Sequence, residues 1–171
     1  RKKVMKTLLR FSALAILLII FTSGVGWGQT IYKSIIPPEI LTLDWEDITN
    51  WVVSTNGGSS WEAATEFPDN TNCDSIIVSA DTELEISTEI HLDQANILGS
   101  VTVFGEMIVE NNSTFYVDCI VSGVLTNSGT ITIGEDAVLK FANGGYYYHS
   151  FSNGGTIPEA IWDDFSNCEI Q

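Results

Sequence analysis

Apolar residues alternate with polar ones along most of the chain beyond residue 28. Upstream of Asp93 the apolar residues use even positions, and from Ile97 to Phe141 they use mainly odd positions. A repeat of two residues is typical of a β-strand with one buried face, and no helical repeat of useful length competes with it. The change of phase falls at residues 93–96 (Asp-Gln-Ala-Asn), where we expect a turn. The predicted core positions are Ile76, Val78, Leu84, Ile86, Ile90 and Leu92, then Ile97, Val101, Val103, Met107, Val109, Phe115, Val117, Cys119, Val121, Leu125, Ile131, Ile133, Ala137, Leu139 and Phe141; polar even positions such as Asp118 are assigned to solvent.

Glycine- and asparagine-rich segments divide these strands into short pieces. A weak repeat of about eighteen residues superposes residues 105–122 on residues 123–140, so that Gly105 matches Gly123 and Met107 matches Leu125. Such repeats are typical of solenoids, and parallel crossovers are right-handed as a rule. We therefore expect an all-β fold, a right-handed parallel β-helix or similar solenoid. The same turn spacing also fits a β-sandwich of about seven strands.

A tryptophan-rich segment precedes the alternating region. Trp45, Trp51 and Trp61 lie between Thr42 and Pro68. Each indole can bury a large apolar area, and the exposed end of a solenoid needs a cover for its strand edges. We therefore divide the exported part into a leader with an N-terminal tryptophan-rich cap, residues 29–68, and a solenoid module, residues 69–171.

Residues 1–28 have the organisation of a secretory signal peptide. A basic head is followed by an apolar run from Phe11 to Phe21 and by small residues that end at Gly28. The alternative is an uncleaved membrane anchor, although the apolar run is shorter than the roughly 20 residues that span a bilayer. We expect export to the outer surface or the medium, with the export machinery as the first partner.

Charge changes the picture once this leader is set aside. Residues 29–171 hold two cationic side chains, Lys33 and Lys140, against 22 acidic ones, a formal charge of −20. A surface of that sign repels nucleic acid and anionic lipid, so no nucleic-acid partner is expected. It suits either a solubilising role outside the cell or the collection of Ca²⁺.

Catalytic patterns are missing from the sequence. It contains no nucleophile elbow, zinc-protease helix, phosphate loop or Cys-x-x-Cys pair, and its two histidines, His91 and His149, have no partner at a useful spacing. We therefore assign no catalytic residues and expect no enzyme within this segment. The cysteines Cys73, Cys119 and Cys168 are odd in number, and spacing alone does not say which two would pair.

Two segments are weaker candidates for ligand binding. Asp69, Asn70, Asn72 and Asp74 form an oxygen-rich loop that would suit Ca²⁺, the one cofactor considered, although the same residues are common turn formers. Tyr146, Tyr147 and Tyr148 offer aromatic faces for a glycan, although the alternative is packing along a flank of the solenoid. In a strand, Tyr147 points away from its two neighbours.

The residues also resemble a known protein type. The pattern runs from Asn50-Trp51 through Ser60-Trp61 into the strand at residues 76–78 and then into the turn sequence of residues 123–131. Its most distinctive part joins residues 143–149 (Asn-Gly-Gly-Tyr-Tyr-Tyr-His) to residues 153–158 (Asn-Gly-Gly-Thr-Ile-Pro). Over residues 45–171 the chain resembles the repeat-bearing β-helical surface proteins that gliding-type Gram-negative bacteria export through the type IX system.

The resemblance implies a fragment of a longer surface protein that would continue beyond Gln171 into further turns and a sorting domain. The expected function is that of an exported structural or adhesive extracellular module without its own catalytic site. The alternative is a carbohydrate-binding accessory region of a larger polysaccharide-processing protein. The expected partners are extracellular glycans or other surface proteins.

Overall fold

The structure is a computed structural model that describes residues 29–35, 43–112, 117–150 and 156–170. These residues form short β-strands and one turn of 3-10 helix, η1 (Ile48–Asn50). No helix among them is long and apolar enough to cross a membrane. The strands are β1 (Ile31–Ser34), β2 (Leu43–Asp44), β3 (Trp51–Ser54), β4 (Glu62–Ala63), β5 (Ser75–Val78), β6 (Glu83–Ile86), β7 (Glu89–Leu92), β8 (Ala95–Ile97), β9 (Ser100–Val103), β10 (Glu106–Val109), β11 (Cys119–Val121), β12 (Val124–Asn127), β13 (Thr130–Ile133), β14 (Leu139–Phe141), β15 (Tyr146–His149), β16 (Ile161–Trp162) and β17 (Asn167–Ile170).

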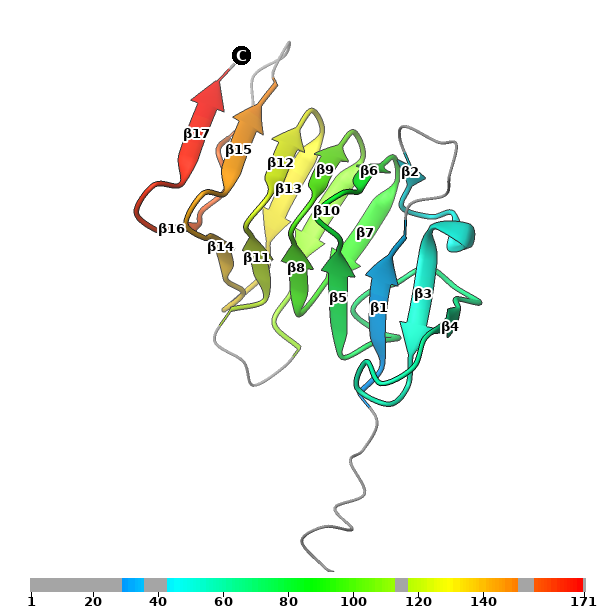
Figure 1. The fold of residues 1–171 in the computed structure, drawn as a ribbon. Helices are drawn as coiled ribbons and strands as arrows, with labels where there is room; N and C mark the ends of the chain where they lie inside the picture. Colours follow the sequence, from blue (N-terminus) through cyan, green and yellow to red (C-terminus); the bar gives the residue numbers. More distant parts are fainter. Residues whose placement is uncertain (1–28, 36–42, 113–116, 151–155, 171) are drawn as a thin grey trace, which may run out of the picture.

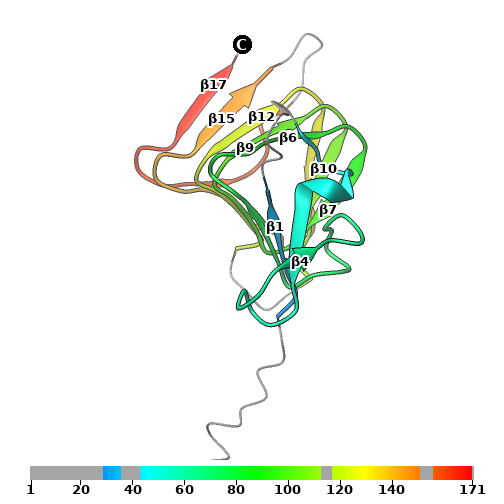
Figure 2. The same cartoon turned by 45° about the vertical axis from the view of Figure 1, so that its right-hand side comes forward.

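The strands assemble into three sheets: successive coils each add a strand to sheets A and B, and three of the coils also add a strand to sheet C (Figure 1). Sheet A has the order β16-β14-β11-β8-β5-β1-β3-β4, sheet B the order β17-β15-β12-β9-β6-β2, and sheet C the order β13-β10-β7. Figure 2 shows the coils lying nearly over one another. The predicted all-β class is confirmed, and the stacked sheets are consistent with a parallel β-helix or solenoid.

Pairing between coils is parallel and in register. Among the described strands, antiparallel pairs occur only where β3 joins β1 and where β4 joins β3. In sheet C, for example, Met107 of β10 lies between Ile90 of β7 and Ile131 of β13. The β-sandwich alternative does not account for these parallel ladders, because sandwiches are built from antiparallel sheets.

The register corrects the predicted eighteen-residue repeat. Met107 pairs with Ile131, and Leu125 pairs with Val101, so Met107 and Leu125 are not equivalent positions. A methyl group on Gly123 would meet the carbonyl oxygen of Gly99, and not the backbone of Gly105. The sequence overlay was wrong because the coils differ in length, and the chain between β10 and β11 is longer than the connection between β7 and β8.

The predicted inward face forms the core. Ile76, Val78, Ile97, Val101, Val103, Met107, Val109, Cys119, Val121 and Leu125 are fully buried, while Ile131 and Ile133 are partly buried. The change of phase is produced by Gln94, whose φ of 55° turns the chain between β7 and β8. The prediction for Phe115 lies outside the described residues.

Asp118 departs from the predicted pattern. Its position was assigned to solvent, yet only 1 % of its surface is exposed. It lies in the bend just before β11, where strand alternation does not apply, so period two was the wrong rule there.

Two tryptophans pack at the N-terminal end of the stack. The Trp45 and Trp51 rings are buried, with centroids 4.8 Å apart and planes at 62°. Trp45 Nε1 donates to the Pro68 carbonyl oxygen at 3.0 Å, and Trp51 Nε1 donates to the Trp45 carbonyl oxygen at 2.8 Å. Trp61 does not join them, because it is 38 % exposed and the Lys33 ammonium lies 5.9 Å from its ring centroid.

β16 and β17 are the last strands of the described stack, and no described strand lies beyond them (Figure 1). We call this the open end. Cys168 lies in register over buried Tyr147 and therefore takes a core position, yet it is exposed, and Ile170 beside it is 68 % exposed. Trp162 stacks on Phe141 at 4.3 Å between ring centroids and still keeps 38 % of its surface exposed. The open end thus presents core-facing apolar side chains and two strand edges that no described strand covers.

Candidate functional site

The three tyrosines do not act as one surface. Tyr147 is fully buried in β15, where its hydroxyl accepts from Asn127 Nδ2 at 3.2 Å and lies 2.9 Å from His149 Nδ1. Burial raises the pKa of Tyr147. Its assignment to a glycan site is therefore corrected, because the strand turns Tyr147 into the core, where its ring contacts Phe141.

Tyr146 and Tyr148 remain on the outer face of sheet B. Their rings stack on each other, with centroids 5.7 Å apart and an interplanar angle of 19°. Tyr146 is 37 % exposed. Because the rings face one another, only their outward faces are open to a ligand. The pair lies beside β17, next to the open end of the stack.

The residues of the predicted calcium loop separate into two groups. Asp69 Oδ1 accepts from the Thr71 backbone and side chain, and Asn72 Oδ1 accepts from the Asp69 N–H at 3.1 Å. These contacts belong to an ordinary polar turn, in which the oxygens already have donors. Within the described residues no group of three or more His, Cys, Asp or Glu side chains is arranged to hold a metal.

Asn70 and Asp74 instead line a polar cavity of about 180 Å³ near the turn from β7 to β8. Asp74 Oδ2 also accepts from the Thr30 N–H at 2.8 Å, which joins the loop to the start of β1. The cavity brings together amide and carboxyl groups from four separate parts of the chain. Its lining residues are Gln29, Asn70, Cys73, Asp74, Asp93, Gln94 and Asn112.

The cysteines are free thiols in three different settings. Cys73 is half-buried and its thiol donates to the Asp69 carbonyl oxygen at 3.1 Å, while Cys119 is fully buried. Burial raises the pKa of both thiols to about 12. Neither is suited to act as a nucleophile near neutral pH, because the thiolate is the reactive form.

A histidine and two glutamates meet on the outer face of sheet C. His91 Nε2 lies 3.0 Å from Glu89 Oε1, and His91 Nδ1 lies 2.7 Å from Glu110 Oε1. Asn70 and Asn112 donate amide hydrogens to Glu110 Oε2. The hydrogen bonds that His91 donates to the Glu89 and Glu110 carboxylates raise the pKa of His91, and accepting from His91 lowers the pKa of Glu110.

This cluster predicts a pH-dependent contribution to stability. The contribution from His91 is present below its ordinary pKa of 6.5 and is lost as pH rises through the higher folded value, whereas that from Glu110 is lost as pH falls below 4.5. The His91→Gln variant should therefore lose most stability, up to about 1 kcal/mol, between these two pH values, since the pair is partly solvated. Urea unfolding across pH measures this, and a constant difference between variant and parent from acid to alkaline pH would contradict it.

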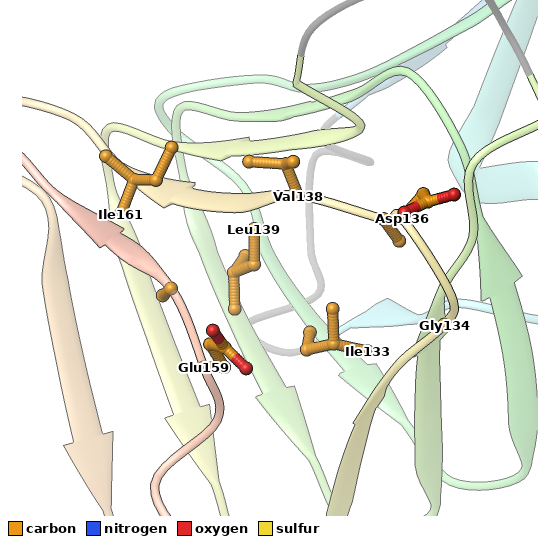
Figure 3. Close-up of a pocket in the computed structure, with 9 residues that line it drawn as sticks. Ile133, Gly134, Asp136, Val138, Leu139, Glu159 and Ile161 are labelled. Carbon is orange, nitrogen blue, oxygen red and sulfur yellow. The ribbon is translucent and has the colours of Figure 1, made fainter.

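A shallow pocket lies beside β13, the last strand of sheet C (Figure 3). Its volume is about 360 Å³, and Figure 3 shows Ile133, Leu139 and Glu159 around the hollow, with Asp136 at its rim. The two carboxyl groups are its only ionisable groups, and its other lining residues are apolar or glycine. The ionisable side chains of the pocket are therefore limited to these two carboxyl groups, Asp136 and Glu159.

Sequence reasoning missed the groupings that depend on coil stacking. His91 and Glu110 meet because β10 lies over β7, and Asp93 and Asp118 meet because the turns before β8 and β11 are neighbours. No fixed spacing signals either pair, since the coils differ in length. In comparisons with protein-family models, curated proteins and solved structures, no match to this chain was found.

Proposed function

We propose that the chain is an exported structural or adhesive module, a right-handed β-helix closed at its N-terminal end by the tryptophan-bearing segment and without a catalytic site of its own. Residues 1–28 support export, and the formal charge of −20 beyond them supports a soluble outer surface. The location is the outer cell surface or the medium. The resemblance to β-helical surface proteins of the type IX system supports the same assignment.

The observation that carries this proposal is the open end formed by β16 and β17. Its strands offer unpaired edges, and Cys168 and Ile170 occupy core-facing positions without a cover. Such edges pair with other strands, which is how β-proteins assemble end to end or edge to edge. Further residues of the same protein beyond Gln171, or the same end of a second copy, would continue these two sheets. The second possibility is the assembly that the 171-residue chain can test.

Charge sets the conditions for that assembly. Asp163, Asp164 and Glu169 lie in or beside the open end, so two copies repel each other at low salt. Salt screens exposed charges over a Debye length of about 10 Å at 0.1 M. Association should therefore strengthen as salt is added, the opposite of an assembly held by ion pairs.

Sedimentation velocity on the purified chain, at two salt concentrations, tests the proposal. Dimers should form with rising protein concentration and salt, and Ile170→Lys should raise the dissociation constant at least about tenfold because it places a charge in the interface. Cys168→Ser serves in every sample to exclude disulfide dimers. The matched control is Phe104→Lys, an apolar side chain that is 53 % exposed at a corner far from this end, and it should leave association unchanged. A monomer under all conditions, or an equal effect of Phe104→Lys, contradicts the proposed assembly.

A second candidate function is glycan binding, favoured by the exposed stack of Tyr146 and Tyr148. The same samples distinguish it in a screen of soluble glycans. Binding that Tyr146→Ala abolishes, and that Tyr147→Phe preserves, favours an accessory carbohydrate-binding role, because Tyr146 is exposed whereas Tyr147 is fully buried. Absence of binding across the glycans leaves the structural or adhesive role.

A further inference from the structure

Two aspartates on adjacent coils are buried beside one another. Asp93 follows β7 and is 8 % exposed, and Asp118 precedes β11 and is 1 % exposed. The Ala95 N–H donates to the Asp118 carbonyl oxygen at 2.9 Å, which holds the later turn directly over the earlier one. Burying a carboxylate costs folding free energy unless a cation or hydrogen-bond donors compensate its charge.

The hydrogen bonds to this pair are incomplete. Asp118 Oδ2 accepts from the Val138 N–H at 2.7 Å, but Asp118 Oδ1 is buried and has no hydrogen-bond partner. Asp93 Oδ1 accepts from Gln94 Nε2 at 3.3 Å, a long contact. Burial raises the pKa of Asp118, and the charge of the neighbouring Asp93 carboxyl raises it further.

Among the described residues no cationic side chain contacts this pair of carboxyl groups. The described residues contain two lysines and no arginine. The Lys140 ammonium lies 2.9 Å from Asp163 Oδ2, and the Lys33 ammonium lies over the Trp61 ring. The other ionisable residues that line the same cavity as Asp93 are Cys73 and Asp74, neither of which is a cation.

The cavity supplies more oxygen ligands on the Asp93 side. Asn70, Asp74, Gln94 and Asn112 border it together with Asp93, and its volume of about 180 Å³ has room for a hydrated ion. Hard cations such as Ca²⁺ take six to eight oxygen ligands from carboxylates, amides, carbonyls and water. An unbonded carboxylate oxygen next to a second carboxylate is the arrangement that such an ion completes.

We propose that Asp93 and Asp118 bind one divalent cation of the calcium type, with the oxygens that border the cavity and water completing its shell. The site differs from the loop that the sequence suggested, since Asp69 and Asn72 are engaged in their own turn. With two carboxylates, the affinity belongs to the weak extracellular range of about 10⁻⁴–10⁻³ M. The proposal is independent of the assembly and glycan proposals above.

Calcium titration of the full chain, followed by calorimetry and by thermal melting, tests this site. In about 10 mM Ca²⁺ the melting temperature should rise by roughly 3 °C over a chelator-treated sample, since the ion binds the folded chain alone. Asp118→Asn keeps an acceptor for the Val138 N–H but removes the charge, and it should abolish both the heat of binding and the shift. Asp93→Asn provides a second variant with the same expected result.

The matched control is Asp69→Asn in the neighbouring loop, which should bind Ca²⁺ as the parent does. Loss of binding in Asp69→Asn with retention in Asp118→Asn would overturn the proposal in favour of the loop. A parent chain that binds no Ca²⁺, together with an Asp118→Asn variant that melts higher at neutral pH, would also overturn it and would indicate a proton shared between the two carboxyl groups. Neither outcome bears on assembly through β16 and β17.

Discussion

Replacement of Gly123 by alanine is expected to destabilise the folded chain by about 3 kcal/mol or more. A Cβ atom at this position would lie 1.9 Å from the Gly99 carbonyl oxygen and 2.5 Å from that of Leu98. Both atoms belong to the backbone of the coil below, so no side chain can rotate away to make room. The Val124 N–H donates to the same Gly99 carbonyl at 2.9 Å, so any displacement also disturbs the hydrogen bonds between the coils.

Urea unfolding followed by circular dichroism measures this effect. Gly134→Ala is the graded control, because its Cβ would lie 3.1 Å from the Val109 carbonyl oxygen, a contact that a shift of a few tenths of an ångström relieves. It should cost clearly less than Gly123→Ala. Equal urea midpoints for the two variants would mean that the backbone around Gly123 shifts at little cost in free energy. Close stacking at Gly123 would then not limit the spacing of the coils.

Replacement of Trp45 by alanine is expected to cost about 3–5 kcal/mol, a large share of the stability of a domain of this size. The variant leaves a cavity beside Trp51, loses the ring contact at 4.8 Å, and leaves the Pro68 carbonyl oxygen without the indole N–H. Trp45→Phe keeps much of the ring volume and should cost less. The midpoint of urea unfolding, with the slope of the transition recorded, measures all three proteins.

Trp61→Ala tests whether the stability that a tryptophan contributes depends on the burial of its indole ring. Trp61 is 38 % exposed, so its removal should cost less than about 1 kcal/mol, mainly through the contact with Lys33. The sequence treats the three tryptophans alike. If Trp61→Ala proved as damaging as Trp45→Ala, the view that the N-terminal end is held by the Trp45 and Trp51 pair alone would be wrong.

The predicted strands are confirmed where alternation is strict, and they fail where the chain bends. Val101 and Val103 are inward as predicted because a strand has a period of two whatever its neighbours are. Asp118 is buried because it lies in a bend, where the direction of a side chain depends on the coil below. Tyr147 is buried for the strand reason, which the sequence had already raised against a glycan surface.

The candidate sites were harder to predict than the strands. The loop at residues 69–74 has calcium-like composition, yet the structure divides it: Asp69 and Asn72 bond within the turn, and Asn70 and Asp74 face the cavity. The partners of Asp74 in that cavity, Asp93 and Gln94, come from a later coil. Local sequence does not report such neighbours, because contacts between coils depend on the length of each connection.

By itself the sequence determined the all-β class, the inward face of most strands between residues 76 and 141, the charge of the chain and the lack of a catalytic motif, because these depend on composition and on the two-residue period of a strand. Only the tertiary structure decided which coil positions stack. It places Gly123 over Gly99, Glu110 beside His91 and Asp118 beside Asp93. The physical reason is that backbone hydrogen bonds between parallel strands set the register, while connections of unequal length hide that register from any fixed repeat in the sequence.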